Sequence, residues 1–208
     1  MPQRRNKAAP EDREIRVFDR LSSLGFLRST VNLSSMSVFL VGYRGSGKST
    51  VGAIVARMLG FGMLDTDQHS VAAAGRSIRD IFKQDGELRF RDLETQALRH
   101  ALTLDKHVIA TGGGIIVRDE NRRFIRQSGQ SVVYLRCDAE QLQARIHGDV
   151  NTIANRPSLT ELGGGIEEIR QLLALRDPLY REVATIVVEA GGRETEDVAD
   201  DIVARLGG

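Results

Sequence analysis

From residue 37 onward, short runs of aliphatic and β-branched residues alternate with longer stretches that suit amphipathic helices. This alternation is typical of βαβ units, in which helices connect parallel strands. Five runs are predicted to be strands, at residues 38–41, 62–64, 107–110, 131–135 and 184–188. The pattern therefore predicts an α/β fold with a five-stranded parallel sheet and helices on both of its faces.

Polar residues mark where three helices should begin. Ser77 precedes one helical stretch, Asp138 is followed three residues later by Gln141 as in a capping box, and Thr195 precedes the last amphipathic run. Two stretches interrupt the alternation, at about 66–94 and about 148–165. The second contains an Asn-Arg-Pro sequence and three consecutive glycines, which predict a mobile flap.

The composition is that of a globular protein and excludes several classes. Of the 208 residues, 41% are hydrophobic, but no apolar run reaches the roughly 18 residues of a membrane span. The one cysteine, Cys137, has no partner for an internal disulfide and is predicted to be an apolar filler at a strand end. The four histidines lack metal-ligand spacing. A net charge of +1 gives no electrostatic reason to expect nucleic acid as a partner.

Residues 1–35 are predicted to be an N-terminal extension of a domain formed by residues 36–208. The first ten residues are polar and contain two prolines, which is typical of disorder. Apolar residues then recur every three positions between 15 and 24, which predicts one short amphipathic helix. The extension has no apolar segment of a secretory signal, and its acidic residues argue against a transit peptide. Because Met36 directly precedes the first predicted strand, we hypothesise that the extension is dispensable or even lies upstream of the native start.

The most specific motif follows the first predicted strand. Residues 42–49 read Gly-Tyr-Arg-Gly-Ser-Gly-Lys-Ser and match the phosphate-binding P-loop, G-x-x-x-x-G-K-[ST]. Backbone N–H groups of such a loop surround phosphate oxygens, while Lys48 would contact the β- and γ-phosphates and Ser49 would offer its hydroxyl to Mg²⁺. Tyr43 and Arg44 occupy variable positions. Arg44 could contact a phosphate from an exposed loop, but it is expected to face solvent. The predicted ATP-binding residues of this segment are Gly45, Ser46, Gly47, Lys48, Ser49 and Thr50.

Further polar residues follow two other strands, at the sheet edge where ligands of such folds gather. Asp65 and Asp67 come after the second strand, where one could reach Mg²⁺ through water and the other a neighbouring hydroxyl. Residues 112–114 are three glycines after the third strand, and they would let backbone N–H groups approach a ligand closely. Each feature alone also occurs in ordinary loops. Arginine suits carboxylate and phosphate groups, and the candidates in separate segments are Arg91, Arg156 and Arg176.

These motifs occur in an order that resembles the shikimate kinase family. The P-loop is followed by Asp-x-Asp, Phe-Arg-x-x-Glu around Arg91, Gly-Gly-Gly, Arg-Pro at Arg156 and Arg-x-Pro-Leu-Tyr from Arg176. The resemblance covers residues 36–206 and implies a P-loop kinase fold with a substrate-binding helical insertion and a lid at the two interruptions. It also implies an enzyme that uses ATP and Mg²⁺ to phosphorylate the 3-hydroxyl of shikimate, a step of aromatic amino-acid (chorismate) biosynthesis.

The resemblance implies roles for individual residues. Asp67 would hold the 3-hydroxyl and act as its base or orienting group, and Asp65 would reach Mg²⁺ through water beside Ser49. Arg156 would act on the transferring phosphate together with Lys48. The other implied contacts are the shikimate carboxylate for Arg91 and Arg176, the shikimate ring for Gly112, Gly113 and Gly114, and the adenine for Arg145 and Arg193.

Two other interpretations stay open on the sequence alone. Another P-loop small-molecule kinase, such as a gluconate or nucleoside monophosphate kinase, would share the loop but would not require the pair of arginines. A catalytically inactive, kinase-like regulatory module is also conceivable, although it need not retain Lys48, Asp67, Arg91 and Arg176 together. We expect a cytoplasmic monomer whose partners are small molecules, with no nucleic-acid or membrane partner.

Overall fold

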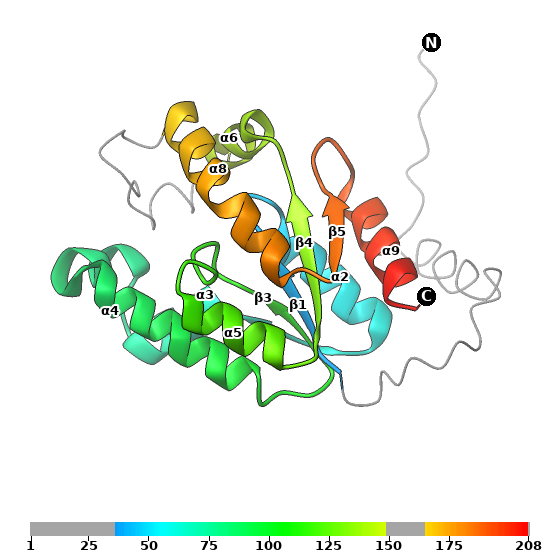
Figure 1. Cartoon of the computed structure of the whole chain (residues 1–208), viewed down its shortest axis with the longest axis horizontal. Helices are drawn as coiled ribbons and strands as arrows, with labels where there is room; N and C mark the ends of the chain where they lie inside the picture. Colours follow the sequence, from blue (N-terminus) through cyan, green and yellow to red (C-terminus); the bar gives the residue numbers. More distant parts are fainter. Residues whose placement is uncertain (1–35, 149–164, 208) are drawn as a thin grey trace, which may run out of the picture. The chain divides into compact units, whose positions relative to one another are not determined.

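The predicted strands pair into one parallel five-stranded sheet in the order β2-β3-β1-β4-β5. The structure, a computed structural model, describes residues 36–148 and 165–207 of the chain (Figure 1). The strands are β1 (Val38–Val41), β2 (Gly62–Asp65), β3 (His107–Ala110), β4 (Ser131–Arg136) and β5 (Ile186–Glu189). β1 lies at the centre, where Leu40 is in register with Ala110 of β3 and with Val133 of β4.

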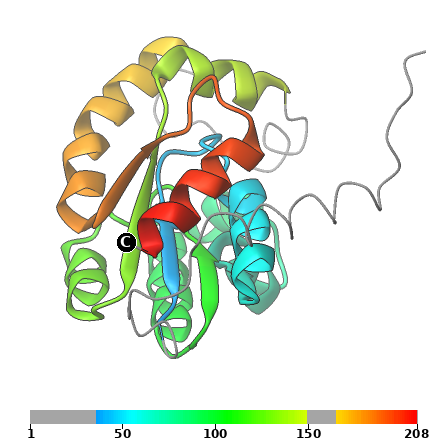
Figure 2. The same ribbon diagram turned by 90° about the vertical axis from the view of Figure 1, so that its right-hand side faces the viewer.

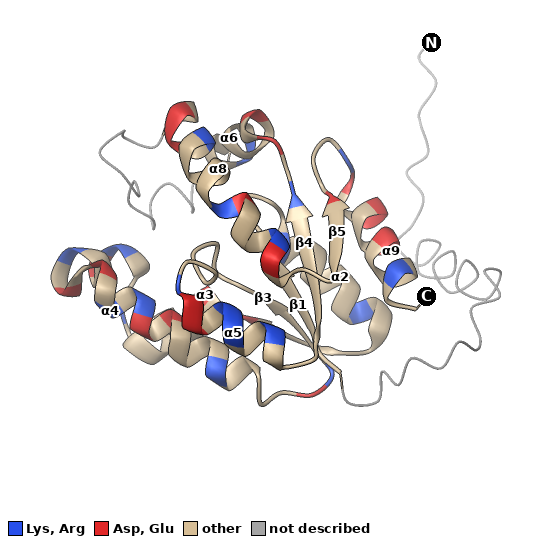
Figure 3. Ribbon diagram, in the orientation of Figure 1, with Lys and Arg blue, Asp and Glu red and all other residues tan. Residues whose placement is uncertain are grey.

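The central strand is apolar throughout because helices cover both faces of the sheet. Val38 and Leu40 face one hydrophobic cluster, Phe39 and Val41 face another, and all four side chains are fully buried. The ribbon of β1 and β3 accordingly carries no charged residue (Figure 3). The centre of the sheet is thus an uncharged base for the polar residues that follow its strands.

Two groups of helices provide these coverings, as Figures 1 and 2 show. The first cluster includes α2 (Lys48–Leu59) and α9 (Thr195–Leu206), which pack against each other. The second cluster contains the C-terminal part of α4 (Ile78–Ala101), α5 (Asp119–Gln127) and the C-terminal part of α8 (Ile166–Val183). Helix α6 (Ala139–Gly148) packs against α8.

The first interruption of the strand–helix alternation has a small hydrophobic core of its own. Helix α3 (Thr66–Ala74) packs on α4, and the cluster contains Ile78, Ile81, Phe90 and Leu93. Helix α4 is kinked at Gly86, whose φ of 80° and ψ of 174° are not helical. Glycine reaches this positive φ without the strain that other residues would carry. Residues on both sides of the kink belong to this cluster, because Ile78 and Ile81 precede Gly86 whereas Phe90 and Leu93 follow it.

The predicted strands are all present, with small differences at their ends. β2 includes Asp65, β4 extends to Arg136, and β5 begins at residue 186 rather than 184. The backbone N–H of Ala184 still donates to Tyr180 at the end of α8, which delays the strand. Apolar and β-branched residues alone could not indicate this hydrogen bond.

The predicted helix starts are also found. The Ser77 hydroxyl accepts from the Asp80 backbone N–H, the Gln141 side chain accepts from the Asp138 backbone N–H at 3.3 Å, and α9 begins at Thr195. Cys137 is buried at the end of β4, as predicted, and its burial raises the pKa of its thiol. None of the described helices combines the length and the apolar character needed to cross a membrane.

A buried hydroxyl connects the beginnings of β1 and β3. The Ser37 side chain is fully buried, donates to the Leu104 carbonyl at 2.7 Å and accepts from the His107 backbone N–H at 3.1 Å. We predict that Ser37→Ala lowers the free energy of unfolding by about 1–3 kcal/mol, because two partly buried backbone groups lose their partner. Urea denaturation of both proteins measures the difference.

The matched control is Thr103→Ala, which removes an exposed hydroxyl that donates to the His100 carbonyl at 2.8 Å. Water can replace that hydrogen bond, so the free energy of unfolding should change by less than about 0.5 kcal/mol. Equal losses in the two variants would contradict the importance of burial at Ser37.

Candidate active site

The P-loop connects the end of β1 to the beginning of α2, as its sequence predicts. Gly47 has a φ of 95°, a left-handed conformation that favours glycine and turns the chain into the helix. Helix α2 begins at Lys48, so its positive end faces the loop. The Lys48 ammonium is largely buried and donates to the carbonyl oxygens of Gly42 at 2.9 Å and Tyr43 at 2.8 Å.

Asp65 connects the P-loop side of the site to α3. One of its carboxylate oxygens accepts from the Ser49 hydroxyl at 2.6 Å. The other accepts from the backbone N–H groups of Asp67 and Gln68, which makes Asp65 the N-cap of α3. Strand β2 therefore ends at a carboxylate that is fixed from both sides. The paired oxygen groups of Ser49 and Asp65 are of the kind that Mg²⁺ prefers.

An open cleft of about 860 Å³ runs along the P-loop, a size that suits a nucleotide. Predicted site residues that line it are Gly45, Gly47, Lys48, Ser49, Thr50, Asp65, Asp67, Gly113, Arg145 and Arg193. Ser46 is buried instead, with its hydroxyl 3.4 Å from the Lys48 ammonium. In the described part of the chain, no group of three or more His, Cys, Asp or Glu side chains could hold a metal ion.

Arg145 and Arg193 both lie at this cleft, although they come from different segments. Arg145 of α6 donates to the Ala190 carbonyl at 2.9 Å and approaches the Ser46 carbonyl at 3.5 Å. Arg193 follows β5 and is held by Asp201 of α9 at 2.9 Å. Arg145 therefore connects the P-loop to the segment after β5.

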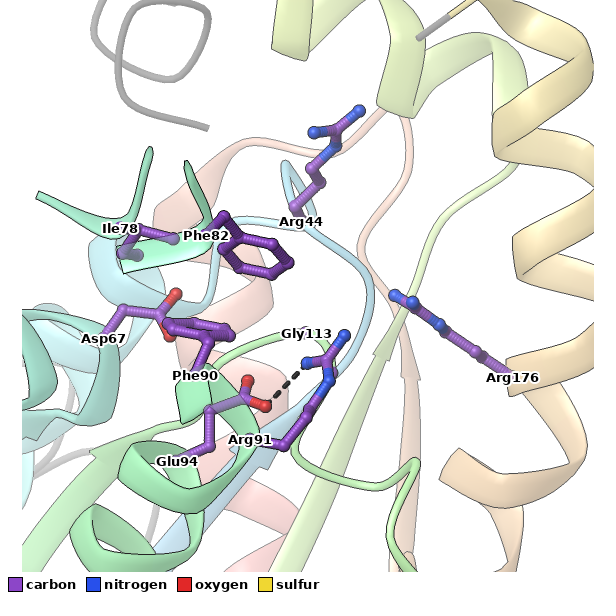
Figure 4. Close-up of a pocket in the computed structure, with 10 residues that line it drawn as sticks. Arg44, Asp67, Ile78, Phe82, Phe90, Arg91, Glu94, Gly113 and Arg176 are labelled. Atoms are coloured by element: carbon purple, nitrogen blue, oxygen red, sulfur yellow. Dashed lines mark hydrogen bonds and ion pairs between the residues drawn. The ribbon is translucent and has the colours of Figure 1, made fainter. Parts of the chain in front are cut away.

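A second pocket adjoins the cleft and is shown in Figure 4. Its apolar side chains are Ile78, Phe82 and Phe90 of α4, and the two phenyl rings lie 4.8 Å apart. Its charged side chains are Arg44, Asp67, Arg91, Glu94 and Arg176, and Gly113 and Gly114 complete it. Asp67 and Gly113 line both the pocket and the cleft, so they lie at the boundary between them.

The two predicted carboxylate-binding arginines enter the pocket from different helices, Arg91 from α4 and Arg176 from α8 (Figure 4). Arg91 is buried and forms ion pairs with Glu94 at 2.6 Å and Glu87 at 2.7 Å. A side chain at residue 114 would collide with the Arg91 guanidinium, so the absence of a side chain there lets Arg91 keep its position. Gly112 does not line the pocket, but it has similarly little room beside the carboxylates of Asp67 and Glu94.

Glu94 is a site residue to which sequence reasoning gave no role. Its carboxyl is 2% exposed and lies in the pocket beside Arg91. Burial is the main cause that raises the pKa of Glu94 to about 7; the Asp67 carboxylate acts in the same direction, and Arg91 opposes it. The spacing of three residues from Arg91 within a helix was the available signal for this contact.

Tyr180 is a second residue whose contribution the sequence did not reveal. Its hydroxyl donates to the Gly113 carbonyl at 2.6 Å, and its fully buried ring stacks on Tyr134 with centroids 4.9 Å apart. Burial raises the pKa of Tyr180, which keeps the hydroxyl protonated as a donor. Helix α8 thus fixes the glycine segment after β3 as well as carrying Arg176.

The expectation that Arg44 faces solvent is wrong. Its side chain is only 10% exposed, and its guanidinium lies 3.6 Å from the fully buried carboxylate of Glu168 on α8. Tyr43, to which no role was given, is buried in the core, and its ring lies 5.7 Å from the Arg176 guanidinium carbon. The P-loop sequence could not indicate these contacts, because they depend on how α8 packs. Arg156 and the predicted lid at about 148–165 lie largely or wholly outside the described residues.

Comparisons with known proteins agree on one family. The family model described as shikimate kinase matches residues 44–207. The chain is 39% identical over 174 residues to the shikimate kinase of Ralstonia nicotianae, covering 84% of this chain and 88% of that protein. It is 41% identical over 171 residues to the shikimate kinase of Pseudomonas aeruginosa strain LESB58, covering 82% and 96%.

A solved structure extends the likeness to three dimensions. The structure of shikimate kinase from Acinetobacter baumannii in complex with shikimate is similar to this chain with a TM-score of 0.77 and 36% sequence identity. The match covers 83% of this chain and 93% of that one. The predicted P-loop kinase fold is confirmed by this likeness and by the parallel sheet.

The raised pKa of Glu94 has a consequence for stability. Between its ordinary value of 4.5 and about 7, the folded chain retains a proton on Glu94 that the unfolded chain loses. Ionisable groups shifted in this direction lower the free energy of unfolding as the pH rises through that range. We predict that Glu94→Gln removes this contribution, so its stability relative to the unmodified protein rises by about 2 kcal/mol from pH 5 to pH 8.

Urea denaturation at the two pH values measures this change. The control is Glu87→Gln, which removes the other carboxylate on Arg91 but lies at a side chain that is 60% exposed. Its stability difference from the unmodified protein should vary little with pH. A pH-independent difference for Glu94→Gln as well would contradict the assignment.

Proposed function

Because this chain belongs to the shikimate kinase family, we propose that it transfers the γ-phosphoryl group of ATP to the 3-hydroxyl of shikimate. The products are shikimate 3-phosphate and ADP, in the pathway to chorismate and the aromatic amino acids. One observation carries the proposal: Asp67 lies at the boundary between the P-loop cleft and a pocket that two arginines enter. This arrangement suits transfer of a phosphoryl group from a nucleotide to an anionic alcohol.

The acceptor would lie in the pocket of Figure 4. We propose that the guanidinium groups of Arg91 and Arg176 bind the shikimate carboxylate, since arginine forms paired hydrogen bonds with carboxylates. Phe82 and Phe90 would pack against the ring, and the backbone of residues 112–114 would contact it from the sheet side. Carboxylate recognition at one end of the pocket directs the 3-hydroxyl toward Asp67.

The donor would lie in the cleft, with its phosphates on the P-loop. Backbone N–H groups and the N-terminus of α2 favour phosphate there, and the Lys48 ammonium is close enough to exchange a loop carbonyl for a phosphate oxygen. Ser49 and, through water, Asp65 would hold Mg²⁺, which neutralises phosphate charge when bound. Arg145 and Arg193 would flank the base at the other end of the cleft.

Phosphoryl transfer needs alignment and charge neutralisation more than covalent help from the protein. Asp67 would accept or orient the proton of the attacking hydroxyl, as its place between the two sites favours. Lys48 would stabilise negative charge on the transferring group. Arg156 would contribute a further positive charge from the lid, a role that depends on the family resemblance alone.

The remaining features of the proposal concern the whole protein. We propose that residues 36–208 form the catalytic domain and that residues 1–35 are not needed for the reaction. We propose that the protein acts as a monomer, and the proposed pathway favours a location in the cytoplasm. Small molecules would be its partners, without nucleic acid or a membrane.

Two observations favour this function over the alternatives. Arg91 and Arg176 suit an anionic acceptor, and Phe82 and Phe90 in the same pocket suit a ring, which gluconate in its open-chain form lacks. An inactive regulatory module would have no reason to retain the Lys48 ammonium at the P-loop carbonyls or the hydrogen bond between Ser49 and Asp65. Identity of 39–41% to the shikimate kinases above, across more than four fifths of the chain, supports the same choice.

The decisive experiment is ADP release measured by a coupled assay, with ATP and Mg²⁺ and with or without shikimate. We predict shikimate-dependent release by the full chain, and no more than about 1% of that rate with Lys48→Ala, because the phosphoryl charge loses its partner. Release with gluconate or a nucleoside monophosphate, and none with shikimate, would overturn the proposal.

Substitutions in the acceptor pocket should separate binding from chemistry. We predict that Arg176→Ala raises the KM for shikimate about 10- to 100-fold, because a charge-assisted contact is lost. Asp67→Asn should instead lower kcat by about 10²- to 10⁴-fold with little change in ATP binding. Steady-state kinetics distinguishes the two, and the reverse pattern would refute the roles.

Arg181→Ala is the matched control for Arg176→Ala. Arg181 lies on the same helix, but it is 48% exposed and pairs with Asp177 rather than lining the pocket. Its loss should change the KM for shikimate by less than about threefold.

A further inference from the structure

Arg44 occupies an unusual environment for a P-loop side chain. It extends from the loop toward α8, where Glu168 lies in the first turn of the helix. Glu168 is completely buried, and the side chain of Arg44 is 10% exposed. Burying two opposite charges is costly unless hydrogen bonds satisfy their remaining donors and acceptors.

The hydrogen-bonding capacity of Arg44 is only partly used. Its Nη2 atom lies 3.6 Å from the Glu168 carboxylate, which is longer than a hydrogen bond. Its Nε–H is buried without a hydrogen-bond acceptor among the described residues. A guanidinium carries five N–H donors, so Arg44 retains donors for an additional anion.

The position of Arg44 indicates which anion this is. Arg91 and Arg176 line the acceptor pocket, Arg145 and Arg193 line the nucleotide cleft, and of the arginines in the described ranges Arg44 alone lines both. Its backbone N also abuts the glycine segment, 3.1 Å from where a side chain at residue 113 would begin. Figure 4 shows Arg44 on the far side of the pocket from Arg91. Arg44 is therefore better located for the group that passes between the two sites than for the acceptor carboxylate.

We propose that Arg44 binds the phosphoryl group at the boundary between the nucleotide and the acceptor, and that Glu168 is its counter-ion when no phosphoryl group is there. The inference rests on the proposed function, since it assumes phosphoryl transfer to the neighbouring pocket. A phosphate offers more charge and more acceptor oxygens than one carboxylate, so it competes with Glu168 for the guanidinium. Arg44 is thus a ligand-binding residue, and Glu168 is its positioning residue.

Arg44→Met tests this contact, because methionine retains much of the side-chain length without charge or donors. We expect kcat to fall about 10- to 100-fold and the KM for shikimate to change less than about threefold. The control is Arg57→Met, which removes an exposed arginine of α2 that lines neither site, and it should behave as the unmodified protein.

Calorimetric titrations with ATP, ADP, shikimate and shikimate 3-phosphate locate the contact without turnover. Weaker binding of ATP but not ADP assigns Arg44 to the γ-phosphate of the donor, whereas weaker binding of shikimate 3-phosphate but not shikimate assigns it to the transferred group. We expect Arg44→Met to weaken the binding of ATP relative to ADP, or of shikimate 3-phosphate relative to shikimate, by about tenfold. Unchanged affinities, or an equal loss for shikimate and shikimate 3-phosphate, would overturn the proposal.

Glu168→Gln separates ligand binding from a structural ion pair. If Glu168 competes for Arg44, its neutralisation should leave the affinity for the phosphorylated ligand unchanged or tighter. If the pair only stabilises the fold, this variant and Arg44→Met should lose affinity together, and the proposal fails. If the methionine variant does not fold, Arg44→Lys, which keeps the charge, replaces it in the same titrations. We expect its affinity for the phosphorylated ligand to fall by less than tenfold.

These measurements also distinguish failure of the proposed function. An unmodified protein that does not phosphorylate shikimate would refute the function itself. An active protein whose Arg44→Met variant matches the Arg57→Met control would refute only the role of Arg44.

Discussion

The carbonyl oxygen of Leu40 accepts two hydrogen bonds from Thr111, one from its backbone N–H at 3.1 Å and one from its hydroxyl at 2.9 Å. Leu40 lies two residues before the P-loop, and Thr111 lies directly before the glycine segment. This contact continues the pairing of β1 with β3 beyond the last ladder pair, and it holds the P-loop and the glycine segment together. The nucleotide cleft and the acceptor pocket can share a boundary because these two loops are joined there.

Sequence reasoning succeeded where the signal is local. A strand followed by a P-loop and a helix start at Lys48, and a hydroxyl before a helix at Ser77, depend on neighbours along the chain. Arg44 and Tyr180 could not be assigned in this way, because each acquires its partner from the packing of α8. Glu94 pairs with Arg91 along α4, so its spacing was a local signal that the sequence analysis did not use. The individual roles of the site residues stay predictions, although the structure gathers most of them around two adjoining cavities.

Charge balance explains why so many arginines can be buried around one site. Arg91 is accompanied by Glu94, and Arg44 by Glu168, and each carboxylate is almost completely removed from water. Such pairs hold the guanidinium groups in defined positions, but desolvation offsets much of their attraction. The raised pKa of Glu94 is a consequence of this desolvation. The site is therefore organised for anionic ligands at some expense of the stability of the free protein.

The kink in α4 separates two groups of residues that line the acceptor pocket. Ile78 and Phe82 precede Gly86, whereas Arg91 and Glu94 follow it on the part of the helix that packs toward the sheet. Because Gly86 interrupts the helix, residues before it can change in size or number without rotating the arginine out of the pocket. Selection or design could in this way change the apolar side of the pocket while Arg91 and Glu94 keep their positions.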